Sequence, residues 1–440
     1  MVVKINTGVG ISTRYFNSDF LKNEKVAKKA VEQLNERANK PGQFLNWIGL
    51  PEEQLKRVDY IYEMVNNFKN QTKAKVLSVF GIGGSKHPVE HMLGVNGLNI
   101  GKKDVLFFSD IDSVSMNRFM QTLDNDITNS NFLVVSKSGT TFEPKDALLR
   151  AKSALVESYR GKGLSQKDAE MQASKHFMAV TDKNPATSEL RRTADAENWT
   201  GKFYIHDDVG GRFSALDDHT LFALAYSGMK KSDMIEMLKG AKKMSDIALT
   251  PDFKVNDPLA QATFWATEKA NGVKNQVHQY LGDTFQDTVT WHTQMQNESI
   301  KDTAKQIAKI PDAMHHSAEA HFNPENRYSF ALTSGIEKGN VKENIEGYMT
   351  ALSESYKKSG ALFHETVDTS DLGLTPETAG ALSQSRGFAT VYQELIENNL
   401  KNVEQPKVLN AVLQPHVESY KNIYKLNPEY TVAGRISVNA

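Results

Sequence analysis

Five short apolar runs follow one another along the first half of the chain, and helix-like stretches separate most of them. The runs are Val76–Phe80, Val105–Phe108, Phe132–Val135, Phe177–Val180 and Phe203–Ile205. Short continuous apolar runs are typical of strands that are buried on both faces. Because helical patterns alternate with these runs, the sequence predicts an α/β fold in which helices cover both faces of a parallel sheet.

The second half of the chain repeats this pattern less clearly. Strand-like runs cover 276–281, 328–332 and 361–364, and long helical patterns flank them at 234–247, 258–271 and 388–399. We therefore predict a second sheet domain, joined to the first by a helix near Asp217–Ser227. The predicted segments are 1–70 (helical), 71–220 (first sheet domain), 221–425 (second sheet domain) and 426–440 (tail).

Composition narrows the function classes. The 440 residues carry 52 Lys+Arg and 53 Asp+Glu, so no basic field indicates nucleic acid or a membrane surface as a partner. Cysteine is absent, which excludes disulfides, thiolate catalysis and cysteine-ligated metals. The first residues show no signal-peptide pattern, and no apolar run is long enough for a membrane span. We expect a cytoplasmic protein.

Hydroxyl side chains crowd the segment Ser136–Thr141, which follows the third apolar run and precedes a helix-like stretch. A turn between a strand and a helix directs free backbone N–H groups and the positive end of the helix dipole toward one point. Hydroxyls beside these amides add uncharged donors, a combination that suits phosphate. The alternative is a turn whose hydroxyls cap the helix and bind no ligand.

A glycine-rich loop, Gly81–Ser85, leaves the first apolar run in the same way. Ligands of parallel sheets bind outside the carboxyl ends of strands, so the two loops are expected to converge on one anion. A tight turn without a ligand is equally compatible with this loop taken alone. Lys86 stands where a dinucleotide fingerprint requires its third glycine, and no Walker A loop is present. The remaining interpretation is a phosphate cradle for a small metabolite.

Candidate chemical groups come later in the chain. Gly210–Ser214 follows the fifth run, and its Arg212 is suited to pairing with an anion or stabilising developing charge, unless it lies solvated in a surface turn. Taken singly, Glu298 and Lys421 have no distinguishing context. His315 and Glu319 have the spacing of two metal ligands on a helix, but such pairs are common by chance, and we expect no metal.

Together, these motifs resemble the phosphoglucose isomerase family in its short bacterial form. Gly81–Ser85, Ser136–Thr141 and Asp208–Ser214 stand in the family's order and spacing. Three further segments are similar to the family's catalytic glutamate, histidine and C-terminal lysine motifs: Gln294-x-x-x-Glu298-Ser299, His316-Ser317 and Gln414-Pro415-x-Val417-Glu418-x-x-Lys421. Departures at Lys86-His87-Pro88, Asn297 and His416 indicate a diverged member.

The resemblance implies an aldose–ketose isomerase that interconverts glucose 6-phosphate and fructose 6-phosphate through a cis-enediolate. Glu298 would then move the proton, Arg212 would stabilise the oxyanion, and His316 and Lys421 would open the sugar ring. The sugar phosphate would be held by residues of the two loops and by one glutamine: Gly84, Ser85, Ser136, Lys137, Ser138, Thr140, Thr141 and Gln294. No metal or organic cofactor is required.

The family also implies two sugar-isomerase domains, each with a parallel sheet between helices, and a homodimer in which the histidine completes the neighbouring subunit's site. Glycolysis and gluconeogenesis would be the pathways served. Two alternatives remain open at this point. One is an isomerase of another C6-anionic sugar, either a different hexose 6-phosphate or a 6-sulfonate sugar. The other is a non-catalytic protein that binds sugar phosphates.

Overall fold

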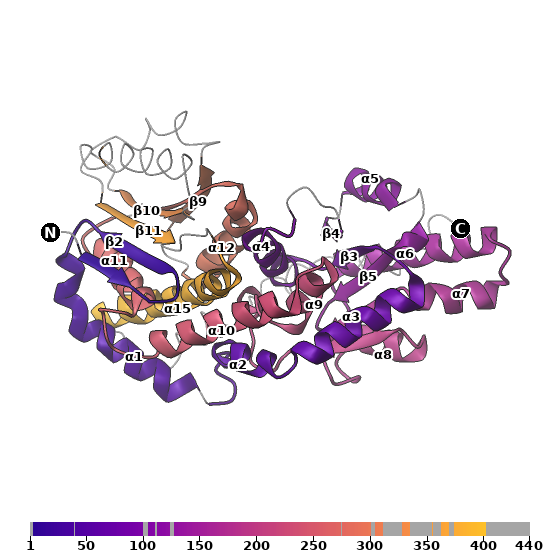
Figure 1. Cartoon of the computed structure of the whole chain (residues 1–440), viewed down its shortest axis with the longest axis horizontal. Coiled ribbons are helices and arrows are strands. Elements are labelled where there is room, and N and C mark those ends of the chain that lie inside the picture. The colour runs from indigo at the N-terminus through magenta and orange to yellow at the C-terminus, as the bar shows by residue number, and fades with distance from the viewer. Residues whose placement is uncertain are drawn as a thin grey trace, which may run out of the picture.

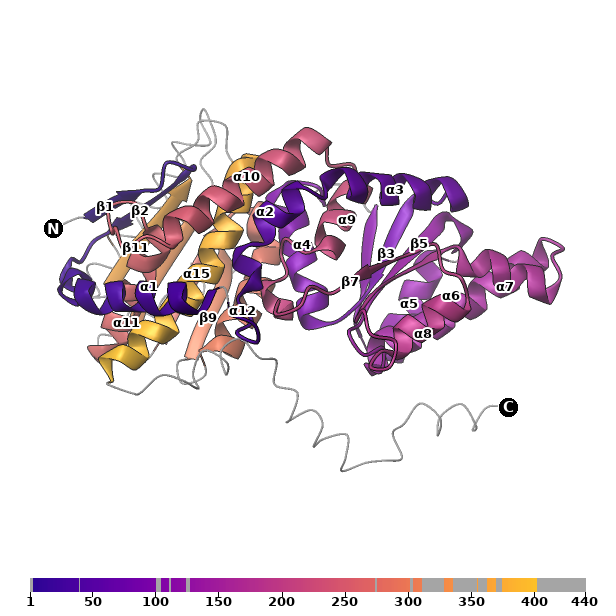
Figure 2. The ribbon, with the colours of Figure 1, turned by 90° about the horizontal axis from the view of Figure 1, so that it is seen from below.

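Two sheets occupy opposite halves of an elongated molecule (Figures 1 and 2). The computed structural model describes the backbone of residues 3–38, 40–99, 104–110, 112–123, 127–273, 275–300, 304–310, 328–334, 354, 362–368 and 374–401. Within these segments, no helix combines the length and the apolar character that crossing a membrane requires.

The first sheet contains five parallel strands in the order β4-β3-β5-β6-β7. Their bounds match the five predicted runs closely: β3 Val76–Phe80, β4 Val105–Phe108, β5 Ser130–Val135, β6 Phe177–Thr181 and β7 Gly201–Tyr204. Alternate side chains along β5 enter different cores, with Leu133 in one and Phe132 in the other. The prediction of a parallel sheet buried on both faces is therefore confirmed.

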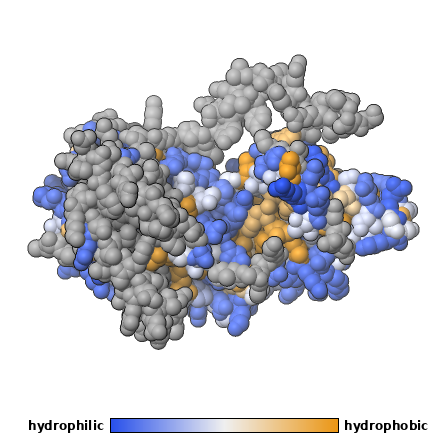
Figure 3. Space-filling view, turned by 90° about the horizontal axis from the view of Figure 1, so that it is seen from above, coloured by the Kyte–Doolittle hydropathy of each residue, from blue (hydrophilic) through white to orange (hydrophobic). Residues whose placement is uncertain are grey.

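Helices cover both faces of this sheet (Figure 2). One layer contains α3 (Val58–Thr72), α4 (His87–Val95) and α9 (Asp218–Tyr226). The opposite layer contains α5 (Ser113–Leu123), α6 (Phe142–Gly161), α7 (Gln166–Ser174) and α8 (Glu189–Ala196). Apolar surface is visible on the half of the molecule that holds this sheet (Figure 3), where Val105, Leu106 and Phe107 of the edge strand β4 are partly exposed.

The second sheet has six strands in the order β1-β2-β11-β10-β8-β9. Its parallel part comprises β8 Asn275–Leu281, β9 Ala304–Ile310, β10 Tyr328–Ser334 and β11 Leu362–Asp368. Three of these strands were predicted and β9 was not. Helices α10 (Lys231–Ala248), α11 (Asp257–Ala270) and α15 (Pro376–Leu400) pack together beside this sheet (Figure 2).

The N-terminal segment corrects one prediction. A hairpin of β1 (Val3–Asn6) and β2 (Ile11–Tyr15) precedes the helices α1 (Glu24–Ala38) and α2 (Leu50–Leu55), so residues 1–70 are not wholly helical. β2 pairs with β11 in antiparallel orientation, and the Tyr15 hydroxyl donates a hydrogen bond to Asp257 of α11 over 2.9 Å. The hairpin thus extends an otherwise parallel sheet at its edge.

Candidate active site

Strand order places the two predicted anion-binding loops side by side. The chain leaves β3 for β4 on one side and returns to β5 on the other, so the order of strands reverses between β3 and β5. Gly81–Ser85 follows β3, and Ser136–Thr141 follows β5. Ligands of open parallel sheets bind at this kind of reversal. The two loops therefore leave neighbouring strands at the same edge of the sheet, and their convergence on one anion stays a prediction.

The Ser136–Thr141 loop has a tightly determined backbone. Gly139 has φ +76°, and a Cβ there would lie 2.2 Å from the backbone nitrogen of Leu190. The Glu189 N–H, at the start of α8, donates to the Ser138 carbonyl over 2.7 Å. Glycine is required at position 139 because a side chain would be strained and would also collide with α8.

The hydroxyls of this loop bond locally. Ser136 Oγ accepts the Gly139 N–H at 3.1 Å, and the hydroxyls of Ser138 and Thr140 lie 2.7 Å apart. Thr141 is the N-cap residue of α6, but its side chain makes no capping hydrogen bond. The amino end of α6, the partly exposed Ser138 and the exposed Thr140 therefore share one surface, which is suited to an anion.

Arg212 is buried, with 2% of its surface exposed. Its Nε donates to Ser299 Oγ over 2.9 Å, and its Nη1 lies 3.3 Å from Glu298 Oε2. Removal from water lowers the pKa of Arg212 to about 10, and the charge of Glu298 and its hydrogen bond offset part of that effect. The buried Nη2 has no hydrogen-bond partner among the described residues.

Glu298 lies near the carboxyl end of α12 (Gln286–Ser299) and keeps 41% of its side chain exposed. Gln294, one turn earlier, donates from Nε2 to Glu298 Oε1 over 2.9 Å, while the buried Oε1 of Gln294 has no described partner. The carboxylate is thus oriented by an amide on one oxygen and a guanidinium on the other, yet it remains open to solvent. This arrangement is suited to a general base.

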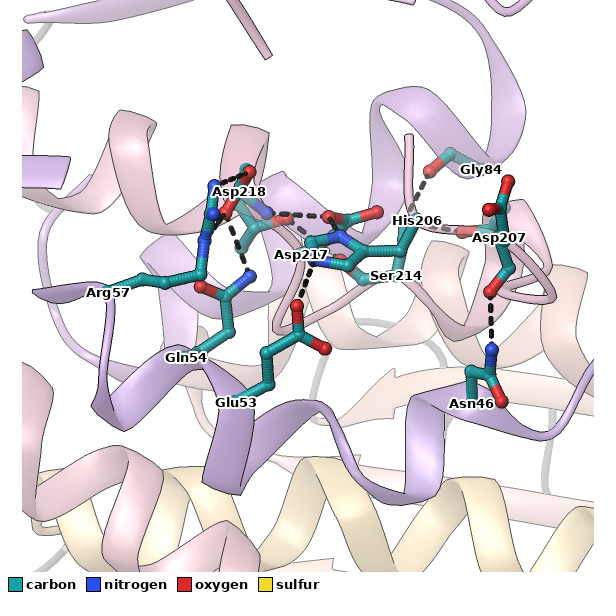
Figure 4. A network of polar contacts seen from close by, with 12 residues as sticks. Asn46, Glu53, Gln54, Arg57, Gly84, His206, Asp207, Ser214, Asp217 and Asp218 are labelled. Carbon is teal, nitrogen blue, oxygen red and sulfur yellow. Dashed lines mark hydrogen bonds and ion pairs between the residues drawn. The ribbon is translucent and has the colours of Figure 1, made fainter. Parts of the chain in front are cut away.

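Two glycines let the Gly81–Ser85 loop pack closely against the segments that carry Arg212 and Glu298. A Cβ on Gly84 would lie 2.4 Å from the carbonyl carbon of Gly211, and one on Gly83 would lie 2.9 Å from Gln294 Nε2. Ser214 Oγ donates to the Gly84 carbonyl over 3.1 Å (Figure 4). The same loop follows β3 next to β5, so it links the anion-binding surface to the Arg212–Glu298 pair.

Two side chains that complete this arrangement were not identified from the sequence. Ser299 holds Arg212 Nε, and Trp291 Nε1 donates to the Arg212 carbonyl over 3.0 Å. Trp291 lies one turn before Gln294 on the helix carrying Glu298, so a helical projection of α12 would have shown it beside that pair. Nothing in the sequence indicates that these side chains meet Arg212.

Of three other residues singled out in the sequence, the structure describes Lys86 but not His316 or Lys421. Lys86, one of the departures from the family pattern, donates to Ser109 Oγ at the end of β4 over 3.0 Å and lies 3.5 Å from Glu90. Its ammonium group is therefore engaged toward the edge of the sheet. His316 and Lys421 lie outside the described residues, as do His315 and Glu319.

Comparison with known proteins shows the family of this chain. The family model for phosphoglucose isomerase matches residues 52–320, more than half of the chain. The chain belongs to the phosphoglucose isomerase family. It is 31% identical over 248 residues to a glucose-6-phosphate isomerase of Clostridium novyi (strain NT), covering 53% of this chain and 50% of that protein. A glucose-6-phosphate isomerase of Bacillus thuringiensis (strain Al Hakam) is 32% identical over 245 residues, covering 52% of this chain and 50% of that protein. The match thus spans about half the length of these curated relatives.

Solved structures show that the fold extends beyond the matched sequence. A hypothetical protein from Thermus thermophilus superposes with a TM-score of 0.74 at 20% identity, covering 97% of this chain and 100% of that one. A glucose-6-phosphate isomerase from Chlamydia trachomatis gives 0.72 at 17% identity, with 99% and 92% covered. The predicted α/β fold of the family is confirmed for the residues that the structure describes.

Proposed function

We propose that this chain is an aldose–ketose isomerase that interconverts glucose 6-phosphate and fructose 6-phosphate. One observation carries the proposal. A partly exposed carboxylate, Glu298, lies beside a buried guanidinium, Arg212, whose Nη2 has no described partner. A buried N–H without a partner is costly unless a ligand supplies the acceptor. An oxyanion that forms next to Glu298 would supply one.

The reaction moves a proton between two adjacent carbons through an enediolate. Glu298 would take the proton from one carbon and return it to the other, which is general acid–base catalysis by a positioned carboxylate. Arg212 would stabilise the negative charge that develops on the sugar oxygen. The surface formed by Ser136–Thr141 and the amino end of α6 would bind the phosphate, and binding energy there would position the reacting carbons against Glu298.

Two parts of the proposal rest on the family resemblance. His316 and Lys421 would carry the proton transfers that open the sugar ring, and His316 would act in the site of the neighbouring subunit of a homodimer. A monomer is then expected to be inactive. Size-exclusion chromatography with light scattering, followed by assay of each fraction, tests this, and an active monomer would refute it. The activity would place the protein in cytoplasmic sugar metabolism, in glycolysis and gluconeogenesis.

A coupled assay of fructose 6-phosphate conversion tests the proposed reaction. Turnover that Glu298→Gln abolishes would support it. Turnover of a different hexose 6-phosphate or of a 6-sulfonate sugar, with fructose 6-phosphate inert, would replace the substrate but retain the reaction type. Tight binding of fructose 6-phosphate without any turnover, in a dimeric preparation, would instead identify a binding protein.

A further inference from the structure

We infer that His206 is a positioning residue for Arg212. Its pair with Asp217 joins the two ends of the segment that carries the arginine. This inference rests on the proposed function, because it assigns His206 a part in the same reaction. His206 follows β7, and Asp217 is the N-cap residue of α9. His206 Nδ1 lies 2.5 Å from Asp217 Oδ1 (Figure 4).

The surroundings of His206 favour a charged pair. Burial alone would lower the pKa of His206, but the hydrogen bond and charge of Asp217, together with the charges of Asp218 and Glu53, raise it to about 9. Glu53 lies 3.2 Å from Nε2 of His206 on the other side of the ring. His219 is the remaining titratable neighbour, and burial lowers its pKa, so it adds little positive charge there.

A second acidic residue in the first turn of α9, Asp218, is bound by donors from another part of the chain. Asp218 accepts from Gln54 Nε2 at 2.9 Å and from Arg57 Nε at 3.2 Å, and both donors come from the α2–α3 region (Figure 4). His206, Asp217 and Asp218 also lie close enough together to share a metal ion. The guanidinium of Arg57 and the imidazole of His206 already balance these carboxylates, so we assign no metal to the cluster.

Hydrogen bonds carry the restraint from Asp217 to Arg212. The Asp217 N–H donates to the Ser214 carbonyl over 3.0 Å, and the Thr220 hydroxyl donates to the same oxygen over 3.1 Å. Ser214 in turn donates to the carbonyl of Gly84 in the Gly81–Ser85 loop. Arg212 stands two residues before Ser214 within the same short turn. Loss of the His206–Asp217 pair would therefore loosen the C-terminal anchor of the arginine turn.

Two conservative variants test the assignment. His206→Gln keeps a hydrogen-bond donor but removes the charge, and Asp217→Asn keeps an N-cap side chain while removing its charge. For each variant, we expect kcat to fall about 10- to 100-fold, because a misplaced Arg212 stabilises the transition state less well. KM for the sugar phosphate is expected to stay within about threefold, since the Ser136–Thr141 loop is untouched. The double variant should lose no more than either single variant, because both remove the same pair.

A second measurement does not depend on turnover. Arg212 is buried, so phenylglyoxal should label it slowly in the native protein, and mass spectrometry would show faster labelling in both variants. His176→Gln is the control, because His176 is a buried histidine that bonds Tyr159 and the Ser130 carbonyl, away from the arginine turn. It is expected to leave kcat and Arg212 labelling unchanged.

The possible results separate the inference from the proposed function. If the native protein turns over no sugar phosphate, the proposed function fails, and the labelling of Arg212 alone decides whether His206 holds the arginine turn. Unchanged kcat and unchanged labelling in both folded variants would overturn the positioning role. A raised KM with unchanged kcat would also overturn it, because that result would place His206 in substrate binding.

Discussion

The Ser136–Thr141 loop and the Arg212–Glu298 pair differ in how far apart their members lie in the sequence. Ser136–Thr141 makes hydrogen bonds within itself, to the end of β6 and to the nearby start of α8. The arginine and the glutamate come from segments far apart in sequence, and they meet because the Gly81–Ser85 loop, the turn that carries Arg212 and α12 pack together. A loop of contiguous residues can therefore be predicted from a short motif, whereas the Arg212–Glu298 pair depends on the assembled fold.

The largest effect is expected from a substitution in the Arg212–Glu298 pair. Glu298→Gln should lower kcat about 10²- to 10⁴-fold, because the amide cannot accept the substrate proton. Binding of fructose 6-phosphate, measured by isothermal titration calorimetry, should change little, since the Ser136–Thr141 loop proposed to bind the phosphate is intact. Wild-type turnover in this variant would remove Glu298 from the role of base, and weak binding would show that the two regions do not act separately.

A substitution at Gly84, where the Gly81–Ser85 loop packs against Gly211, should affect both regions at once. Gly84→Ala would place a methyl group 2.4 Å from the carbonyl carbon of Gly211, where both contacting groups are backbone and cannot move aside cheaply. We expect a loss of about 1–3 kcal/mol in the free energy of unfolding, together with reduced turnover. Urea denaturation and the isomerase assay measure the two effects.

Gly161→Ala is the matched control for that change. Gly161 belongs to α6, and a Cβ there would meet nothing within 4 Å. This variant is expected to be as stable as the native protein or slightly more stable, because alanine favours the helix. Equal destabilisation by both substitutions would show that the contact of Gly84 with Gly211 is unimportant.

A substitution in the Ser136–Thr141 loop should lower the affinity for the sugar phosphate. Ser138→Ala or Thr140→Ala removes one hydroxyl donor to a charged ligand, which corresponds to a rise in KM of about tenfold with kcat nearly unchanged. Ser232→Ala, in an exposed turn of α10, is the control. A fall in kcat at constant KM would contradict the assignment of this loop to ground-state phosphate binding.

The smallest expected effect is a pH dependence of stability. The pKa of His206 is raised to about 9 in the folded protein, above its usual value near 6.5. The charged pair of His206 with Asp217 therefore contributes about 1–2 kcal/mol to the free energy of unfolding. This contribution is complete below pH 6.5 and is lost as the pH rises through about 9. Urea denaturation from pH 6 to 10 should show this loss in the native protein and a flatter profile in His206→Gln. Parallel profiles of the two proteins would show that the charged pair does not contribute to stability.

The sequence predicted the first sheet well because each of its strands is a short apolar run bounded by turn residues, and that pattern needs no partner to be visible. The N-terminal hairpin was missed for the opposite reason. Val3–Asn6 and Ile11–Tyr15 are short and partly polar, and they become strands by pairing with each other and with β11. β9 likewise depends on its pairing with β8. Where neighbours in space determine a strand, local propensity predicts it poorly.

Motif spacing alone predicted an anion-binding loop, an arginine turn and a candidate glutamate. Each of these depends on local backbone chemistry, such as the positive φ of Gly139 or the hydroxyls after β5. Only the tertiary structure decided that Arg212 is buried against Ser299 and Glu298, that Gly84 touches Gly211, and that His206 pairs with Asp217. These contacts arise from the packing of segments that are distant in sequence, because burial and electrostatic pairing are set by neighbours in space.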